Sequence, residues 1–231
     1  MKRVLEPELM QDLLQVQAYS EADFSESDES LVNRIEEYLL VEGKKLDSKS
    51  LIVDVGCGPG NITQRLGSRW PYSKIIGIDG SQPMLAVARR RKSEEKARGS
   101  LSEISYYCCD IASLGDGEIN LEQSVDLIVS NSCLHHVHDP SCFWQALECL
   151  SHKGTVHFHR DLRRPSSIEK AIALQRIYLP ESPQVLIDDY LASLQASFTV
   201  EEVIAQLEME GLEELSVYEY GDRYLEVVGT L

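Results

Sequence analysis

The chain has 231 residues, of which 43% are hydrophobic and 26% are charged. This length and composition allow a substantial apolar core and exclude an intrinsically disordered protein, and no stretch approaches the ~18 apolar residues that a membrane span needs. The net charge of −16 repels phosphate backbones and acidic lipids alike, so we expect neither nucleic acid nor a membrane as partner.

The first 46 residues are predicted to form two helices, over about 6–19 and 30–42, separated by the acidic, Ser-rich stretch 20–30. From residue 51 onward, short runs rich in β-branched residues alternate with longer amphipathic runs, which is typical of a parallel sheet wrapped by helices. Strands are predicted over residues 51–55, 74–78, 104–109, 125–130, 155–159, 214–220 and 223–228. Helices are predicted over 61–70, 82–98 and 140–150.

Residues 162–210 are predicted to be a helical insertion after the fifth strand, in which a helix restarts at Thr199, an N-cap followed three residues later by Glu202. We expect this insertion and the first 46 residues to cover the edge of the sheet. The last two strands are joined only by Gly221 and Asp222. This connection is too short for a crossover, so the two strands are predicted to be an antiparallel hairpin.

The cysteines and histidines show no metal-binding spacing. The six cysteines form no CxxC pair, and the first residues lack the apolar core of a signal peptide, so we expect reduced thiols and a cytoplasmic protein. The histidine groups at 135–138 and 157–159 have no Cys or carboxylate at a standard companion spacing, so we expect no metal site.

A glycine-rich loop, residues 54–61, follows the first predicted strand with the sequence Asp-Val-Gly-Cys-Gly-Pro-Gly-Asn. Glycines at alternate positions let the backbone pass against a ligand, and the helix that follows offers free amides to an anionic group. The loop differs from the dinucleotide pattern GxGxxG because Asn61 takes the place of the third glycine. Asp79 and Asp110 end the next two strands, where carboxylates can bind a ribose diol and an exocyclic amine.

Across about residues 45–231 the chain resembles the class I S-adenosylmethionine-dependent methyltransferases, above all in the segment 53–60. The resemblance implies an α/β fold with a seven-stranded, mostly parallel sheet in the order 3-2-1-4-5-7-6, its last strand antiparallel, flanked by helices. It also implies S-adenosylmethionine as cofactor and S-adenosylhomocysteine as product. The chain is then a single methyltransferase domain, 1–231, with a helical cap (1–46), a cofactor-binding core (47–161), an acceptor-side insertion (162–210) and a hairpin (211–231).

The same resemblance implies roles for individual residues. Gly56, Gly58 and Gly60 would pass under the methionine part of the cofactor, and Asp79 would hold its ribose hydroxyls. Gly80 and Met84 would flank the adenine, whose amino edge would meet Asp110 and Ile111. The expected cofactor-binding set is completed by Asp54, Cys57, Asn61 and Asn131.

The fourth strand leads into residues 130–136, which resemble the post-strand motif of small-molecule members of the family. The Asn-Pro-Pro-aromatic sequence of enzymes that methylate nucleobase amines is absent, so we expect a small-molecule acceptor. Methyl transfer needs a deprotonated acceptor, and His135 or His136 is the expected catalytic base. Alternatively, one ring packs beneath the cofactor and the other caps the next helix, and an acceptor that ionises easily needs no base.

The acceptor is expected to contact Asp161 and Arg164, which follow the fifth strand, and Tyr19, which with Phe24 would belong to a lid. A structural ion pair and ordinary helix packing are the competing interpretations. The predicted function is methyl transfer to O, N or C of a small molecule by a monomer or homodimer. A non-catalytic binder of S-adenosylmethionine or S-adenosylhomocysteine, or a protein methyltransferase, are the alternatives.

Overall fold

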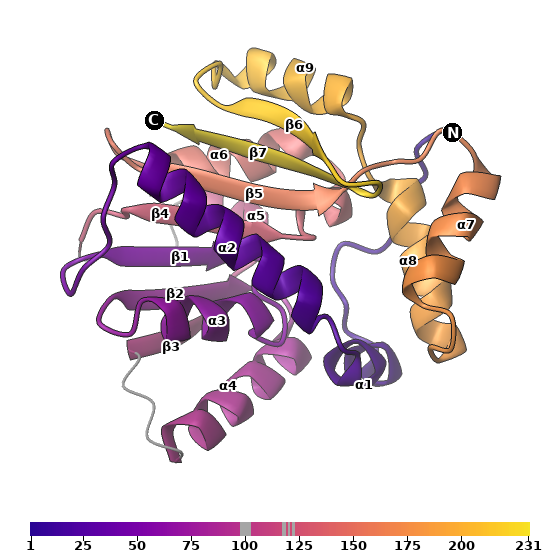
Figure 1. The fold of residues 1–231 in the computed structure, drawn as a ribbon, viewed down its shortest axis with the longest axis horizontal. Coiled ribbons are helices and arrows are strands. Elements are labelled where there is room, and N and C mark those ends of the chain that lie inside the picture. Colours follow the sequence, from indigo (N-terminus) through magenta and orange to yellow (C-terminus); the bar gives the residue numbers. More distant parts are fainter. Residues whose placement is uncertain (98–102, 117–118, 120, 122) are drawn as a thin grey trace.

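The computed structural model describes residues 1–97, 103–116, 119, 121 and 123–231. The described residues contain one seven-stranded sheet with helices on both faces (Figure 1). The strands are β1 (Leu51–Val55), β2 (Lys74–Asp79), β3 (Glu103–Cys108), β4 (Leu127–Asn131), β5 (Val156–Leu162), β6 (Ser216–Tyr220) and β7 (Tyr224–Thr230). The helices are α1 (Leu13–Glu21), α2 (Ser25–Val41), α3 (Asn61–Arg69), α4 (Gln82–Ala97), α5 (Ile111–Gly115), the short turn η1 (Leu134–His136), α6 (Pro140–Leu150), α7 (Ile168–Tyr178), α8 (Gln184–Ala196) and α9 (Val200–Glu210).

The strand order is β3-β2-β1-β4-β5-β7-β6. β1 to β5 pair in parallel, whereas β7 is antiparallel to both of its neighbours. This confirms the predicted fold, strand order and terminal hairpin. Because β1 to β5 run in one direction, the loops that follow them meet at one edge of the sheet, called here the carboxyl edge.

The central strands are buried on both faces, and all five residues of β1 are buried. Ile52 and Val129 pack with α2 and α3 on one face, whereas Val53 and Ile128 pack with α6 and α9 on the other. A strand covered on both faces favours apolar residues at successive positions, which explains why β1 is apolar on both faces except at the buried Asp54.

The predicted first helix, 6–19, is wrong at its start, because α1 begins only at Leu13. Pro7 lacks an amide donor and restricts the residue before it, which opposes a helix there. Asp12 supplies the cap that starts α1, and its side chain accepts from the backbone of Leu14 at 2.9 Å. Residues 1–12, named the N-terminal segment below, instead run in non-helical conformation along the carboxyl edge (Figure 1).

The predicted break over residues 20–30 is also wrong, because α2 begins at Ser25. The Asp23 carboxylate accepts a hydrogen bond from the Ser25 amide at 2.9 Å. Glu26 and Asp28 lie in the first helical turn, where negative charge is stabilised by the free amides. The acidic residues therefore start the helix and do not interrupt it.

The insertion after β5 consists of α7, α8 and α9, as predicted. Its expected cap is present, because the Thr199 hydroxyl accepts from the Glu202 amide at 3.3 Å and the Glu202 carboxylate accepts from the Thr199 amide at 3.0 Å. α4 is described as far as Ala97, and its predicted end at residue 98 lies outside the described residues.

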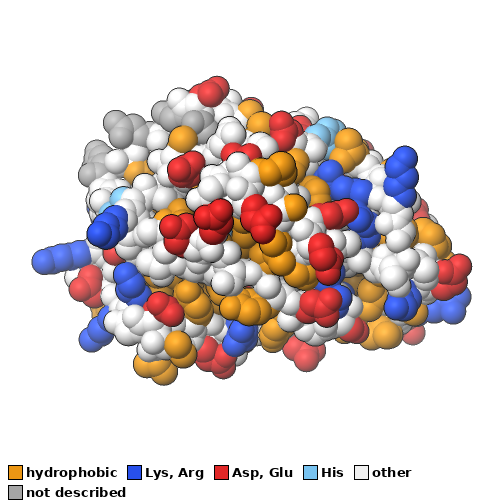
Figure 2. All heavy atoms as spheres, turned by 90° about the horizontal axis from the view of Figure 1, so that it is seen from above, with side chains coloured by type: hydrophobic (Ala, Val, Ile, Leu, Met, Phe, Trp, Pro, Cys, Tyr) orange, Lys and Arg blue, Asp and Glu red, His pale blue; other side chains and the backbone are white. Residues whose placement is uncertain are grey.

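The surface carries the charge imbalance of the sequence. On the face shown in Figure 2, acidic side chains gather in the middle and most Lys and Arg lie toward the two ends. Within the described part of the chain, no helix is long and apolar enough to cross a bilayer.

The cap of α9 can be tested directly. Thr199→Ala removes the hydroxyl that satisfies the Glu202 amide, so we expect the free energy of unfolding in urea to fall by about 1 kcal/mol. Thr199→Ser keeps the hydroxyl and should stay close to the wild type. Equal destabilisation by both substitutions would contradict the capping role.

Candidate active site

A cavity of about 820 Å³ lies at the carboxyl edge and is also lined by α1, α2, α7, α8 and the β6–β7 turn. Most residues singled out in the sequence line it: Tyr19, Asp54, Gly56, Cys57, Gly58, Asn61, Asp79, Gly80, Met84, Asp110, Ile111, Asn131, His135 and His136. Gly60, Asp161 and Arg164 are not among its lining residues. The structure therefore brings most of the expected set together around one cavity.

The glycine loop depends on left-handed backbone. Gly56 has a φ of 71°, and a Cβ there would lie 2.3 Å from Cys133 Sγ, so only glycine fits between the loops after β1 and β4. Gly60 has a φ of 82°, and a Cβ there would lie 2.5 Å from the Tyr106 hydroxyl. Gly60 thus packs against Tyr106 of β3, and its expected place under the methionine part of the cofactor stays a prediction.

Two carboxylates at strand ends shape the cavity wall. Asp79 accepts from the amides of Gly58 at 2.8 Å and Ser81 at 2.7 Å, so it ties the glycine loop to the loop after β2. Burial raises the pKa of Asp79, and these two amides oppose the shift. Asp110 caps α5 by accepting from the Ser113 amide at 2.8 Å. Both side chains are held in fixed orientations beside the cavity.

Asp54 is buried beneath the glycine loop with an exposed fraction of 1%. Its carboxylate accepts from the Thr63 hydroxyl at 2.6 Å, so it fastens the loop to α3. Burial raises the pKa of Asp54 to about 7; the Thr63 hydrogen bond opposes this shift, and the nearby charge of Asp79 adds to it. Near neutral pH this carboxyl group is therefore partly protonated.

The loop after β4 is held by Asp161. Asp161 accepts from the amides of Cys133 at 2.9 Å and Leu134 at 2.7 Å, and its other oxygen hydrogen-bonds Nδ1 of His135. Ser132 in this loop has a φ of 54°, a conformation that side chains rarely adopt and that often marks functional loops. Asp161 is buried and makes these structural contacts, whereas its expected contact with an acceptor stays a prediction.

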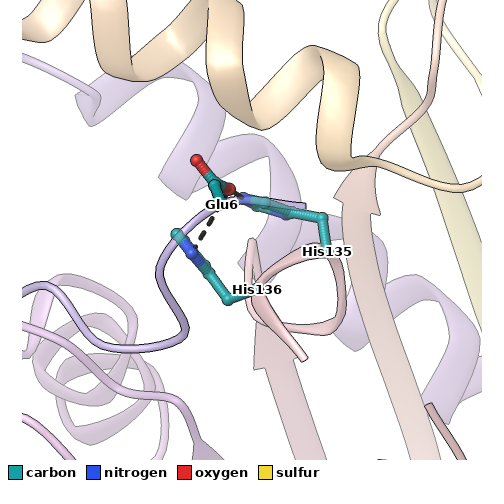
Figure 3. A group of neighbouring side chains, drawn as sticks. All are labelled: Glu6, His135 and His136. Carbon is teal, nitrogen blue, oxygen red and sulfur yellow. Dashed lines mark ion pairs between the residues drawn. The ribbon is translucent and has the colours of Figure 1, made fainter. Parts of the chain in front are cut away.

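The N-terminal segment closes over this loop. Glu6 Oε1 lies 3.5 Å from His135 Nε2 and 3.3 Å from His136 Nδ1 (Figure 3). The Arg3 guanidinium donates to the carbonyls of His135 at 3.3 Å and Val137 at 3.1 Å. It also lies 3.8 Å from the centre of the Phe198 ring. One segment therefore contacts both the side chains and the backbone of the histidine loop.

The two histidines titrate in opposite directions. Burial lowers the pKa of His135, but Asp161 and then Glu6 outweigh burial, so the pKa of this ring is raised. Burial, aided by His135, lowers the pKa of His136 to about 3. A ring held by two carboxylates and a ring that resists protonation are both poorly matched to a general base near pH 7.

Arg164 lies away from the cavity. Its guanidinium donates to Glu202 at 2.5 Å and to the Ser197 carbonyl at 3.1 Å, so it joins the end of β5 to the start of α9. Arg164 therefore makes a structural ion pair, but with Glu202 and not with Asp161, and its expected contact with an acceptor stays a prediction.

The lid residues expected from the sequence do meet. The Tyr19 and Phe24 rings lie 5.0 Å apart between α1 and α2, and both line the cavity.

The sequence interpretation missed Arg160, which is 1% exposed and lines the cavity. Arg160 donates to the buried Glu226 carboxylate at 2.5 Å and to the Ser27 carbonyl at 3.2 Å, and it lies 4.3 Å from the centre of the Tyr220 ring. Four tyrosines that line the cavity were missed as well: Tyr178, Tyr190, Tyr220 and Tyr224. The only signal for them was an excess of tyrosine near the hairpin, because they come together only in the folded chain.

The raised pKa of Asp54 predicts a pH dependence of stability. The folded state keeps a proton on Asp54 between about pH 4 and 7, where the unfolded chain has lost it, so the free energy of unfolding falls as pH rises through this window. Relative to Asp54→Asn, the wild type should lose about 2–3 kcal/mol between about pH 5 and 8 in urea unfolding. The exposed substitution Asp188→Asn is the control. Equal pH profiles of wild type and Asp54→Asn would refute the shift.

A family model described as a methyltransferase domain matches residues 52–154. The trans-aconitate 2-methyltransferase of Variovorax paradoxus is 38% identical over 94 residues, which cover 41% of this chain and 31% of that protein. The malonyl-(acyl-carrier protein) O-methyltransferase of Acetivibrio thermocellus is 37% identical over 102 residues, which cover 43% of this chain and 32% of that protein. The chain thus spans about a third of the length of these curated relatives.

Solved structures share the fold over nearly the whole chain. A SAM-dependent methyltransferase from Aquifex aeolicus has a TM-score of 0.63 at 16% identity, covering 95% of this chain and 98% of its own. The plantazolicin methyltransferase BpumL, in complex with SAH, has a TM-score of 0.63 at 14% identity and covers 94% of both chains. Residues 52–154 thus match a methyltransferase family model, and the sheet as a whole has the fold of these methyltransferase structures.

Proposed function

We propose that the protein transfers a methyl group from S-adenosylmethionine to O, N or C of a small-molecule acceptor. One observation carries this proposal. The glycine loop, Asp79 and Asp110 line the same cavity as residues of the cap and of the insertion, so cofactor and acceptor could lie side by side in it. We also propose the division of 1–231 into cap (1–46), core (47–161), insertion (162–210) and hairpin (211–231). A covered cavity fits a small molecule better than a protein side chain.

We propose that the cofactor lies along the carboxyl ends of β1, β2 and β3. Asp79 would accept from ribose hydroxyls and Asp110 from the adenine amine, while Gly56 and Gly58 would let the backbone approach the methionine part. The remaining contacts would come from Asp54, Cys57, Asn61, Gly80, Met84, Ile111 and Asn131, which line the cavity. When bound, the cofactor supplies a methyl group on a cationic sulfur. The negative charge of partly ionised Asp54 would stabilise that cation electrostatically.

The chain's own contribution is positioning and exclusion of water. The loops after β1 and β4 are held in place by hydrogen bonds, so they would keep the cofactor and the acceptor aligned within the cavity. The Tyr19–Phe24 pair lines the same cavity and would exclude water from it. The opposed pKa shifts of His135 and His136 disfavour proton removal by either ring. We therefore infer an acceptor that is nucleophilic without a histidine base, such as an amine in its neutral form or a group that ionises easily.

The charge of the cavity narrows the acceptor class. Among the described residues that line it, ten are acidic and two are arginines. The charge of Arg160 is matched by buried Glu226, and Arg223 stacks on Tyr178 with 3.3 Å between guanidinium carbon and ring centre. Little free positive charge remains for an acidic acceptor, so a neutral or cationic acceptor with an aromatic or apolar body fits best.

The cofactor proposal is tested by calorimetric titration with S-adenosylmethionine and S-adenosylhomocysteine. We expect a Kd of about 1 μM for the wild type, which corresponds to about 8 kcal/mol. Asp79→Asn keeps the size of the side chain but loses the charged acceptor, so affinity should fall about 10- to 100-fold. Asp188→Asn, at an exposed position of α8, should bind like the wild type. Absence of wild-type binding would refute the proposed function.

The acceptor class is tested by the release of S-adenosylhomocysteine with matched panels of carboxylates and amines. We expect turnover within the neutral and cationic panel and none above background with trans-aconitate, whose three carboxylates meet an acidic cavity. Methylation of trans-aconitate would contradict the argument from charge. Cofactor binding without turnover on any panel member would favour the non-catalytic binder instead.

A further inference from the structure

Glu6, His135 and His136 form a compact cluster at the junction of the N-terminal segment and the histidine loop (Figure 3). Each offers one ligand atom, and the three atoms lie within 4.8 Å of one another. Figure 3 shows the Glu6 side chain pointing at both imidazole rings. None of the three residues belongs to the set assigned to the cofactor, and the two rings line the cavity.

Two polar atoms of the cluster lack hydrogen-bond partners within the described part of the chain. Glu6 Oε1 and His136 Nδ1 are buried and have no hydrogen-bond partner among the described residues. The Glu6 side chain is only 9% exposed. A buried carboxylate oxygen without a donor is costly, so the geometry calls for a positive centre between Glu6 and the rings.

The donor set and its spacing fit a transition metal. Two imidazole nitrogens and one carboxylate oxygen are the protein ligands of many three-ligand zinc sites. Bonds of about 2.0–2.1 Å at tetrahedral angles place ligand atoms about 3.3–3.4 Å apart. The two distances from Glu6 Oε1, 3.5 Å to His135 and 3.3 Å to His136, are close to that spacing.

An outer carboxylate orients one of the rings. Asp161 hydrogen-bonds Nδ1 of His135, which leaves Nε2 directed toward Glu6. Metal-bound histidines commonly donate their second nitrogen to a carboxylate in this way, which fixes the tautomer and the ring plane. Asp161 is itself held by the amides of Cys133 and Leu134, so the ring is positioned by buried contacts.

We propose that Glu6, His135 and His136 bind one divalent transition-metal ion of the zinc class, with a fourth position open toward the cavity. The ion fastens the N-terminal segment across the carboxyl edge, in addition to the contacts of Arg3. The metal site is independent of the proposed methyl transfer, because its ligands are not the residues assigned to the cofactor.

The test is metal binding by the full chain after removal of metal with a chelator. Zn²⁺ is titrated against a chromophoric competitor, and Co²⁺ is added separately to record the visible absorption of tetrahedral cobalt. We expect one equivalent of metal, and an affinity reduced at least about 100-fold by Glu6→Gln and by His136→Asn. Glu8→Gln alters an exposed neighbour of the cluster and should bind like the wild type.

The outcomes separate the proposal from its rivals. Absence of stoichiometric binding, or an equal loss in Glu8→Gln and His136→Asn, would overturn the site and indicate adventitious binding or a plain ion pair between Glu6 and His135. If Glu6→Gln unfolds, His136→Asn decides, because Nδ1 of His136 makes no hydrogen bond that the substitution removes. Cofactor titration of the same samples tests the proposed function separately.

Discussion

Parallel strands that end at one edge of the sheet are the constraint on which the rest of the structure depends. β1 to β5 bring the loops after residues 55, 79, 108, 131 and 162 to the same side. Backbone groups at this edge no longer belong to the sheet ladder, so side chains must satisfy them. Many side chains of the site therefore hydrogen-bond the backbone of these loops, and only the atoms not used in this way are available to a ligand in the cavity.

Three carboxylates fix most of the loops at the carboxyl edge. Asp54 fastens the glycine loop to α3, Asp79 joins the loops after β1 and β2, and Asp161 holds the loop after β4. Each accepts from amides or hydroxyls, which keeps a charge tolerable away from water. The same burial that makes these contacts strong raises the pKa of Asp54 and Asp79. Stability and titration are thus linked through the same groups.

Local patterns predicted the features that short segments determine. Three short segments determine their own local structure: the largely apolar strand at 51–55, the glycine loop and the two-residue connection at 221–222. The structure confirms the strands and the hairpin around them. The predicted start of α1 and the predicted break before α2 were wrong because the Asp12 cap and the hydrogen bond from the Ser25 amide to Asp23 depend on single side-chain geometries.

In the candidate site, too, the sequence predicts the position of a residue better than the direction of its side chain. Position in the sequence placed Gly60, Asp161 and Arg164 at the correct edge, but the direction of a side chain depends on its partners. Asp161 turns toward two amides, and Arg164 turns toward Glu202. Glu6 carries no sequence signal for a role beside His135, since only the folded path of residues 1–12 brings the two together. A metal-ligand search by spacing therefore misses such a cluster.

The sequence match to the methyltransferase family model is confined to the core of the chain and leaves most of the covering segments outside it. The family model covers residues 52–154, which contain the glycine loop, Asp79 and Asp110. The tyrosines of the other cavity end, Tyr178, Tyr190 and Tyr224 among them, lie outside that match. Similarity in the core therefore supports the proposed shared cofactor, whereas the proposed acceptor would meet segments outside the matched core. The acidic side chains and tyrosines that line the cavity are the physical reason to expect an acceptor other than a polycarboxylate.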